Sequence, residues 1–455
     1  MRELVWMTAF ALVACAEARP IDRPDDEPPP ALEPLVRIAE DRPLRPWLFL
    51  DDEHLLVAER QTLHYDDVFV IDLPTRTLTP QVPPNGSPWR SLTLGGYGAG
   101  AVEHPLYVRT RAPDGGAADF LWRADDGSFA PVYESACPTD TPRVFYDDAD
   151  RWLVSEVRED RCEGSRTLIV TDLDTGATER ITDGSADARG GQFVLGSFFF
   201  LNGAALERYD LTSKTTEVVV DAIPAADTAG FDDTAPGDFA VSRLGHVAFL
   251  VGSTLTVRDP TSGLDVVVSE DAHAVITWSG DGRALTYLAE ISRGEYRLQV
   301  FDRFERTRRA LAPNTYAVTF PTNAERTRFS FTGDRGTYLA TFDDDPVRIS
   351  DCEARSAAML ADGVIVWCRD TAVVTDGAGA PRLAMATSDA PAVVSPNERW
   401  AIVRQDTVGL HVLDLHDLTT EVIVVPGELR SVVATTDRRF AVTTGQTIEV
   451  HVWPE

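Results

Sequence analysis

The sequence predicts an all-β fold, a propeller built from four-stranded antiparallel blades. From residue 35 onward the 455-residue chain repeats a unit of short apolar runs and polar turns, and no amphipathic helical period interrupts it. Most units contain an aliphatic run that ends at or near Asp, spaced by about 33 to 53 residues, which is close to the length of a propeller blade. Some runs are apolar without alternation, as expected for strands covered on both faces.

The aliphatic run that ends near Asp is the clearest part of the repeat. Residues 68–73, 168–173 and 410–415 are its best copies, and each places Asp before a polar turn. The weaker copies end at or near Asp125, Asp210, Asp259, Asp302, Asp343 and Asp376.

The apolar runs favour a propeller over a sandwich. Residues 198–201 and 247–251 are apolar at every position, which suits inner strands packed between neighbouring blades. Residues 178–182 are mixed, as expected of a strand at the outer rim. A sandwich strand with one solvated face would alternate instead.

A turn motif identifies the type of propeller. Residues 278–287 read WSGDGRALTY and resemble the W-S-P-D-G-R-x-L-x-Y motif of TolB-type, WD40-like propellers, and residues 395–403 are a second match. The resemblance covers most of residues 41–455 and implies a fold, not an activity. The motif residues are expected to form tight turns before buried strands and are assigned a structural role. These residues are Asp281, Gly282, Arg283, Asn397, Glu398 and Arg399.

The chain contains nine candidate hairpins and a terminal half-unit at residues 431–453. This predicts about eight to ten repeat units. One ring is the main expectation, and two smaller rings remain the alternative. Residues 35–39 are expected to supply the outer strand that the terminal unit lacks and so to close the ring, which removes an exposed sheet edge.

The N-terminal residues predict a bacterial lipoprotein. Residues 1–14 read as a short signal peptide that ends in Leu-Val-Ala before Cys15, a match to the lipobox in which the cysteine is acylated. Residues 15–34 then form a proline-rich tether, and residues 35–455 form the propeller. The alternatives are an ordinary secretory signal or a misassigned start. Ala16 after the cysteine favours, by resemblance to the enterobacterial sorting rule, the outer membrane of the cell envelope.

Charge and cysteine content restrict the partners. The chain has 72 Asp and Glu against 42 Lys and Arg, and its net charge of −30 makes nucleic acid a poor partner. Contact with the membrane is expected through the lipid on Cys15 alone. Of the five cysteines, Cys137 with Cys162 and Cys352 with Cys368 are expected to form disulfides. In each pair the first cysteine follows the outer strand of one unit and the second follows the second strand of the next unit, at the same end of the sheets.

No motif for metal, cofactor or nucleophilic catalysis occurs in the sequence, so neither catalytic residues, metal ligands nor a cofactor are assigned. The expected function is a non-catalytic scaffold that binds an envelope protein or a small ligand. The alternative is a hydrolase, lactonase or lyase that acts on a small or carbohydrate ligand, with a site built from loops of several blades at the channel mouth.

Overall fold

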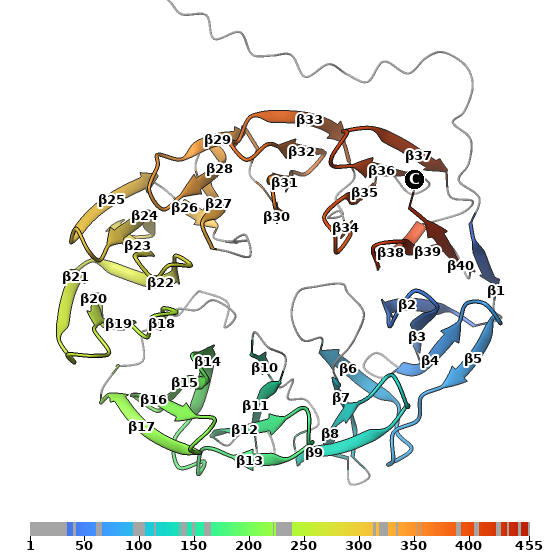
Figure 1. Ribbon diagram of the computed structural model, residues 1–455, viewed down its shortest axis with the longest axis horizontal. Helices are drawn as coiled ribbons and strands as arrows, with labels where there is room; N and C mark the ends of the chain where they lie inside the picture. Colours follow the sequence, from blue (N-terminus) through green and yellow to red (C-terminus); the bar gives the residue numbers. More distant parts are fainter. Residues whose placement is uncertain are drawn as a thin grey trace, which may run out of the picture.

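The chain folds into a ring of ten blades in the computed structural model (Figure 1). Over the residues described below, eight blades are separate four-stranded sheets, and the first two form one eight-stranded sheet because Asp66 pairs with Trp89. The structure describes residues 34–39, 42–60, 66–93, 105–112, 115–135, 137, 143–147, 151–158, 165–221, 223, 239–312, 315–317, 326–333, 335–352, 354, 356–387, 393–404, 409–424, 429–434, 436–444 and 447–453. Over these residues every regular element is a β-strand. The predicted β-propeller is therefore confirmed, with a blade number at the upper end of the expected range and in one ring.

The blades follow one another along the chain, and each runs from the axis of the ring to its rim. The innermost strands are β2 (Leu44–Phe49), β6 (Trp89–Thr93), β10 (Arg143–Tyr146), β14 (Ala188–Val194), β18 (Phe239–Val241), β22 (Ala272–Trp278), β26 (Thr315–Ala317), β30 (Ser356–Leu360), β34 (Val393–Val394) and β38 (Leu429–Ala434). The second strands are β3 (His54–Arg60), β7 (Leu106–Arg111), β11 (Trp152–Arg158), β15 (Ser197–Asn202), β19 (Val247–Val251), β23 (Ala284–Ser292), β27 (Arg328–Gly333), β31 (Gly363–Trp367), β35 (Trp400–Arg404) and β39 (Arg439–Thr444).

The third strands are β4 (Asp66–Asp72), β8 (Ala117–Trp122), β12 (Arg166–Asp172), β16 (Ala205–Asp210), β20 (Thr254–Arg258), β24 (Glu295–Asp302), β28 (Gly336–Thr341), β32 (Thr371–Thr375), β36 (Gly409–Asp414) and β40 (Thr447–Val452). The outermost strands are β5 (Thr77–Pro80), β9 (Phe129–Ser135), β13 (Thr178–Arg180), β17 (Thr215–Val220), β21 (Asp265–Ser269), β25 (Thr307–Ala312), β29 (Val347–Ser350), β33 (Pro381–Ala386), β37 (Thr420–Val424) and β1 (Val36–Ala39). We number the blades 1 to 10 from β2 onward.

The first strand of the chain closes the ring. β1 pairs antiparallel with β40, with Val36 opposite Val450 and Ile38 opposite Ile448. Blade 10 thus takes three strands from the C-terminal end of the chain and one from its N-terminal part. This is the closure predicted from residues 35–39, and it leaves β40 without an open edge.

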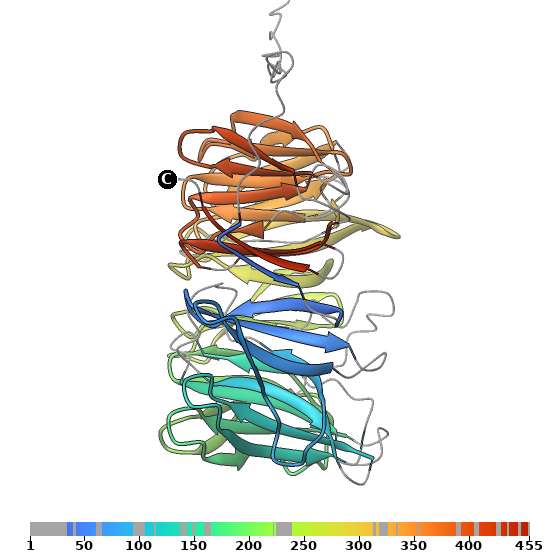
Figure 2. The ribbon, with the colours of Figure 1, turned by 90° about the vertical axis from the view of Figure 1, so that its right-hand side faces the viewer.

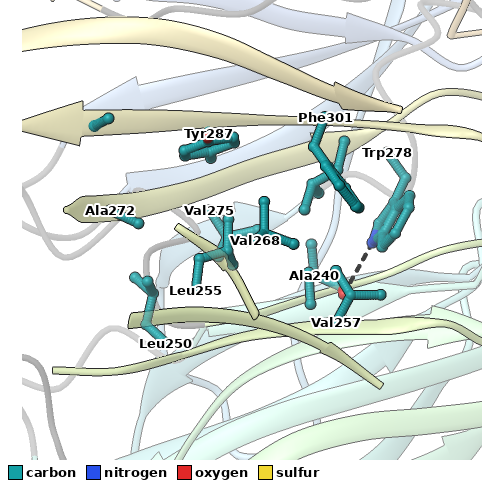
Figure 3. Packing of buried hydrophobic residues seen from close by; sticks show 13 residues of the cluster. Ala240, Leu250, Leu255, Val257, Val268, Ala272, Val275, Trp278, Tyr287 and Phe301 are labelled. Carbon is teal, nitrogen blue, oxygen red and sulfur yellow. Dashed lines mark hydrogen bonds between the residues drawn. The ribbon is translucent and has the colours of Figure 1, made fainter. Parts of the chain in front are cut away.

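The core consists of apolar clusters between neighbouring blades, one at each of the ten interfaces. Figure 3 shows the cluster between blades 5 and 6, where Trp278 packs beside Val257 and Phe301. The indole Nε1 of Trp278 donates a hydrogen bond of 3.1 Å to the carbonyl oxygen of Ala240 in the neighbouring blade. Both faces of each second strand are covered in this way, which explains the uninterrupted apolar runs.

In most blades the predicted Asp at the end of the aliphatic run caps the turn to the outermost strand. Asp125 and Asp343 are exceptions, because Asp126 and the Thr341 hydroxyl accept the backbone N–H groups in their turns. In blade 6 a carboxylate oxygen of Asp302 accepts hydrogen bonds from the N–H groups of Phe304 (2.8 Å) and Glu305 (2.9 Å). Asp210 and Asp259 do the same in blades 4 and 5. Asp recurs at this point of the repeat because its carboxylate accepts the backbone N–H groups of the turn that follows.

The ring has two faces that differ in their connections. Because neighbouring strands within a blade are antiparallel, all innermost strands begin at one face, which we call the start face, and end at the other, the end face. The turns between first and second strands, and between third and outermost strands, lie on the end face. β1 begins there, because Val36 pairs with Val450 near the end of β40. The edge-on view of Figure 2 shows the C-terminus on one face of the disc.

Candidate functional site

The innermost strands combine arginine with a lack of carboxylates. Within the residues that the structure describes, none of the ten innermost strands contains Asp or Glu. Blades 1 to 4 each carry an arginine at the first or second position of this strand, and Arg430 holds the second position in blade 10. We call the four residues of blades 1 to 4 the arginine arc: Arg45, Arg90, Arg143 and Arg189.

The arginine arc lies where the start face meets the axis of the ring, since the innermost strands begin there. Irregular strand pairing accompanies two of its members, with register shifts at Arg90 and after Arg189. Such β-bulges turn a side chain away from the regular pleat. All four arginines are at least partly exposed, although Nη1 of Arg90 is buried.

Carboxylates on the other strands of the same blades hold parts of the arc in place. Arg45 forms an ion pair with the buried Asp66 of β4, and its guanidinium carbon lies 5.7 Å from the ring centre of Trp47. Arg143 lies opposite Glu156 in the register of β10 and β11.

Glu156 is a carboxyl next to the arc whose pKa is shifted from its ordinary value. It is buried between blades 3 and 4, with one oxygen 3.2 Å from Nε of Arg166. Its other oxygen accepts a hydrogen bond of 3.2 Å from the N–H of Gly190, next to Arg189 of the arc. Burial raises the pKa of Glu156, although the positive charges of Arg166 and Arg143 act in the opposite direction.

Aromatic side chains share these strands with the arginines. Trp47, Phe145, Tyr146 and Phe193 on the innermost strands of blades 1, 3 and 4 are half-buried. A surface that combines guanidinium groups with partly exposed rings can hold an anionic group and pack against the rest of the molecule that carries it.

A buried ion pair in blade 2 joins the two strands that lie behind the arc strand β6, and its residues are not part of the arc. Arg109 and Asp119 are both fully buried and form two parallel hydrogen bonds of 2.7 and 2.8 Å. Tyr107 lies in the same interface between blades 2 and 3, and burial raises the pKa of its hydroxyl well above the ordinary value. With no access to solvent, this pair fixes β7 to β8 behind the arc strand β6.

Three of the predicted cysteines lie within the described residues, and each follows a strand that ends at the start face. Cys352 follows β29 of blade 7 and is bonded to Cys368, which follows β31 of blade 8, with 5.9 Å between their Cα atoms. Cys137 is buried after β9, whereas Cys162 lies outside the described residues, so their pairing stays a prediction. Cys15, the signal peptide and the tether up to residue 33 also lie outside them.

The turn of blade 6 shows what its motif residues do. Asp281 accepts hydrogen bonds from the Ser279 hydroxyl and from the N–H of Arg283 (2.9 Å). Gly282 has a φ of 68°, in the left-handed region that favours glycine. The guanidinium group of Arg283 reaches Asp302 at the end of the third strand, with 2.6 Å between the closest atoms.

The turn of blade 9 repeats this arrangement. Asn397 accepts from the Ser395 hydroxyl and the N–H of Arg399, and Arg399 pairs with Asp414 at 3.2 Å. Glu398 takes the left-handed position of Gly282, with a φ of 55°. Both motif turns lie on the end face, opposite the arginine arc, and also reach a neighbouring blade. The N–H of Gly280 donates to the carbonyl oxygen of Arg326 in blade 7, and Glu398 accepts from the N–H of Ala361 in blade 8.

The sequence reasoning did not find the arginine arc. Its members are spaced by about one blade length, so aligning the repeats on their innermost strands would have exposed it. No group of three His, Cys, Asp or Glu residues suited to a metal lies within the described ranges. Those ranges likewise contain no helix long and apolar enough to cross a membrane.

No protein-family model and no curated protein matches the chain. Solved structures resemble it. It matches the tricorn protease over 87% of its own length at 12% identity with a TM-score of 0.30, and spans about half (49%) of that protein. It matches an oligogalacturonate lyase in complex with manganese over 80% of its length and 87% of the lyase, at 12% identity with a TM-score of 0.37.

TolB from Acinetobacter baumannii is a third neighbour, at 12% identity with a TM-score of 0.32, over 74% of this chain and 80% of TolB. At such identities these likenesses concern the fold alone. A propeller fold by itself does not distinguish a scaffold from an enzyme.

Proposed function

We propose that this protein is a non-catalytic scaffold whose propeller binds an acidic partner at the arginine arc. The observation that carries the proposal is the placement of arginine, without any Asp or Glu, on the described innermost strands of a chain with a net charge of −30. Guanidinium groups bind carboxylates through two parallel hydrogen bonds, and the planar fork selects for this geometry.

The acidic remainder of the protein does not prevent such binding. At physiological ionic strength charges more than about 8 Å apart are largely screened, so an acidic ligand responds mainly to the groups it touches. The surrounding carboxylates instead repel acidic ligands elsewhere on the surface, which restricts productive contact to the arc.

Octa-aspartate is a suitable probe, with octa-asparagine as the uncharged control. We expect the full chain to bind the first and not the second, and to bind more weakly as salt rises. Replacing Arg90 and Arg189 with Gln should weaken binding by about tenfold or more, since a hydrogen bond to a charged group contributes ~1.5–3 kcal/mol.

The matched control replaces Arg348 and Arg382 with Gln, which removes the same charge from the outermost strands of blades 7 and 8. It should leave the affinity within about twofold, because exposed charges contribute little. Equal losses in the two double variants would show a diffuse charge effect and overturn the assignment to the arc.

A propeller enzyme is the second candidate, and Glu156 is the observation that favours it. A buried carboxyl of raised pKa beside guanidinium groups is suited to act as a general acid. Turnover of an acidic sugar, lactone or ester that is lost in Glu156→Gln would establish an enzyme. Binding of such compounds without turnover supports the scaffold.

The anchoring of the protein belongs to the same proposal. Acylation of Cys15 would attach the chain to the envelope, and the proline-rich residues up to 34 would hold the propeller up to ~60 Å away, at about 3.1 Å per residue. A palmitate analogue should label the wild type but not Cys15→Ser. Equal labelling of the two would remove the lipoprotein assignment.

A further inference from the structure

Exposed apolar side chains gather at the turns of blades 4, 5 and 6 on the end face. Leu195, Leu264 and Phe304 are 74%, 67% and 64% exposed, and Leu244 is 50% exposed. They occupy turns between first and second strands or between third and outermost strands, all of which lie on this face. We call these four residues the apolar patch.

Part of the patch crosses the interfaces between the blades. A Cβ atom at Gly245 in blade 5 would lie 3.5 Å from Pro260 and 3.9 Å from the side chain of Leu195 in blade 4. A Cβ atom at Gly282 in blade 6 would lie 3.2 Å from Leu244 of blade 5. Leu264 ends the same turn as Pro260. The patch therefore spans three neighbouring blades.

Leu195 has a left-handed backbone conformation, although its exposed side chain gains no packing in the core. It has a φ of 53° and forms a two-residue turn with Gly196, where asparagine is the favoured first residue. Leu418 also has a positive φ, but its side chain packs on the core between blades 8 and 9. The side chain of Leu195 instead points to solvent, so the strain indicates a role outside folding.

Two exposed cations next to the patch also have a positive φ. Lys214 and Arg306 have φ values of 57° and 52° in the turns of blades 4 and 6, at the position that Gly176 and Gly263 occupy in blades 3 and 5. Lys214 is the only lysine of the chain. It pairs with Glu179 at 3.0 Å, and because such exposed pairs are weak it can exchange this partner for another anion.

The charge of the end face is uneven. The exposed Arg243 also borders the patch, and the guanidinium carbon of Arg303 lies 4.2 Å from the ring centre of Phe304. Asp210, Asp259, Asp281 and Asp302 in the same blades accept hydrogen bonds within their turns and keep their negative charge, and Glu305 adds a further exposed carboxylate. Runs of carboxylates lie on other blades of this face, at residues 51–53 and 343–345.

β1 begins at this same face, in blade 10, across the ring from blade 5. A tether at one side of the disc and an apolar patch with flanking cations at the other would let the end face lie flat on a membrane. The start face with its arginine arc would then point away from the bilayer, toward a partner. This orientation rests on the anchoring included in the proposed function.

We propose that the end face of blades 4 to 6 is a membrane-docking surface. Leu195, Leu264 and Phe304 insert into the interfacial region of an anionic bilayer, as apolar side chains at the surface of peripheral proteins do. Lys214, Arg243 and Arg306 bind lipid phosphates around them. Short apolar tips on separate turns suit a fluid lipid surface better than a rigid protein groove.

The test uses the full chain with Cys15→Ser, so that no acyl group contributes, and vesicles of three parts phosphatidylethanolamine to one part phosphatidylglycerol. We expect this protein to sediment with the vesicles and to be released as salt rises. Adding Leu195→Asn and Phe304→Ser should reduce vesicle binding by about tenfold, because two exposed apolar side chains are lost. Val82→Asn, which changes a side chain of similar exposure (61%) at the start face, should have no effect.

The Leu195→Asn substitution separates docking from folding. Asparagine accepts a positive φ more easily than leucine, so this single variant should melt at or above the temperature of its parent while binding vesicles less. Failure of the Cys15→Ser protein to bind vesicles would overturn the proposal, as would equal binding by the patch variant. Octa-aspartate binding by the same proteins tests the arginine arc separately, so the two proposals can fail independently.

Discussion

Removing the strand that closes the ring should destabilise the propeller by an amount the structure allows us to estimate. Val36 and Ile38 are 8% and 6% exposed in β1, and burying such side chains contributes ~1.5–3 kcal/mol each. Arg37 bonds to the buried Glu449 at 2.8 Å, but because its own side chain is half exposed we discount this pair. Deleting residues 35–40 should therefore cost about 5 kcal/mol.

This estimate converts to a melting temperature. The unfolding entropy of ~2.1 cal/mol/K per residue gives about 0.9 kcal/mol/K for roughly 420 residues, so we expect Tm to fall by about 5–6 °C. Differential scanning calorimetry of the full chain and of two deletions measures it. Deleting the tether, residues 16–34, is the control and should shift Tm by less than about 1 °C. Equal shifts in the two deletions would refute the assignment of β1 to the ring.

Three further predictions concern single side chains. Asp119→Ala removes the carboxylate that accepts two hydrogen bonds from the fully buried Arg109 and should cost ~3–5 kcal/mol in urea unfolding; a loss below about 1 kcal/mol would contradict it. Burial lowers the pKa of His451 below its ordinary value of 6.5, so the free energy of unfolding is highest above pH 6.5 and falls as the pH drops below it. His451→Gln should make the free energy of unfolding depend less on pH in this range. An unchanged pH dependence would exclude His451 as its source. Cys352→Ser opens the bond to Cys368 and should cost ~3 kcal/mol, an effect that a reductant should reproduce in the wild type.

The features that the sequence predicted correctly are those determined locally. Asp302 accepts the backbone N–H groups of its own turn, and the motif at Asp281 and Gly282 forms a turn within one blade. Because each contact spans a few residues, the repeat is visible without knowledge of the fold. The pairing of β1 with β40 was also predictable, since an unpaired edge strand at the end of a ring is unfavourable.

The blade count and the arginine arc depend on information that the sequence spreads over the whole chain. The innermost strand of blade 9 is two residues long and that of blade 7 three, too short for a periodic pattern. Each arginine of the arc looks like an ordinary surface residue in its own repeat. Only the packing of consecutive blades side by side brings Arg45, Arg90, Arg143 and Arg189 to one end of the axis.

Glu156 provides a test that connects the charge of the arc to its function. It neutralises part of the positive charge of Arg143 and Arg166, and so competes with an acidic ligand for them. Its pKa is raised above 4.5 by burial, whereas the carboxylates of an aspartate peptide titrate near ~3.9. As the pH falls from neutral toward 4.5, Glu156 gains its proton while octa-aspartate stays ionised, so binding should strengthen. Glu156→Gln should bind more tightly than the wild type at neutral pH and lose most of this pH dependence in a fluorescence titration. If the variant keeps the dependence of the wild type, Glu156 does not compete with the ligand, and the contribution of Arg143 to binding would have to be assigned to another contact.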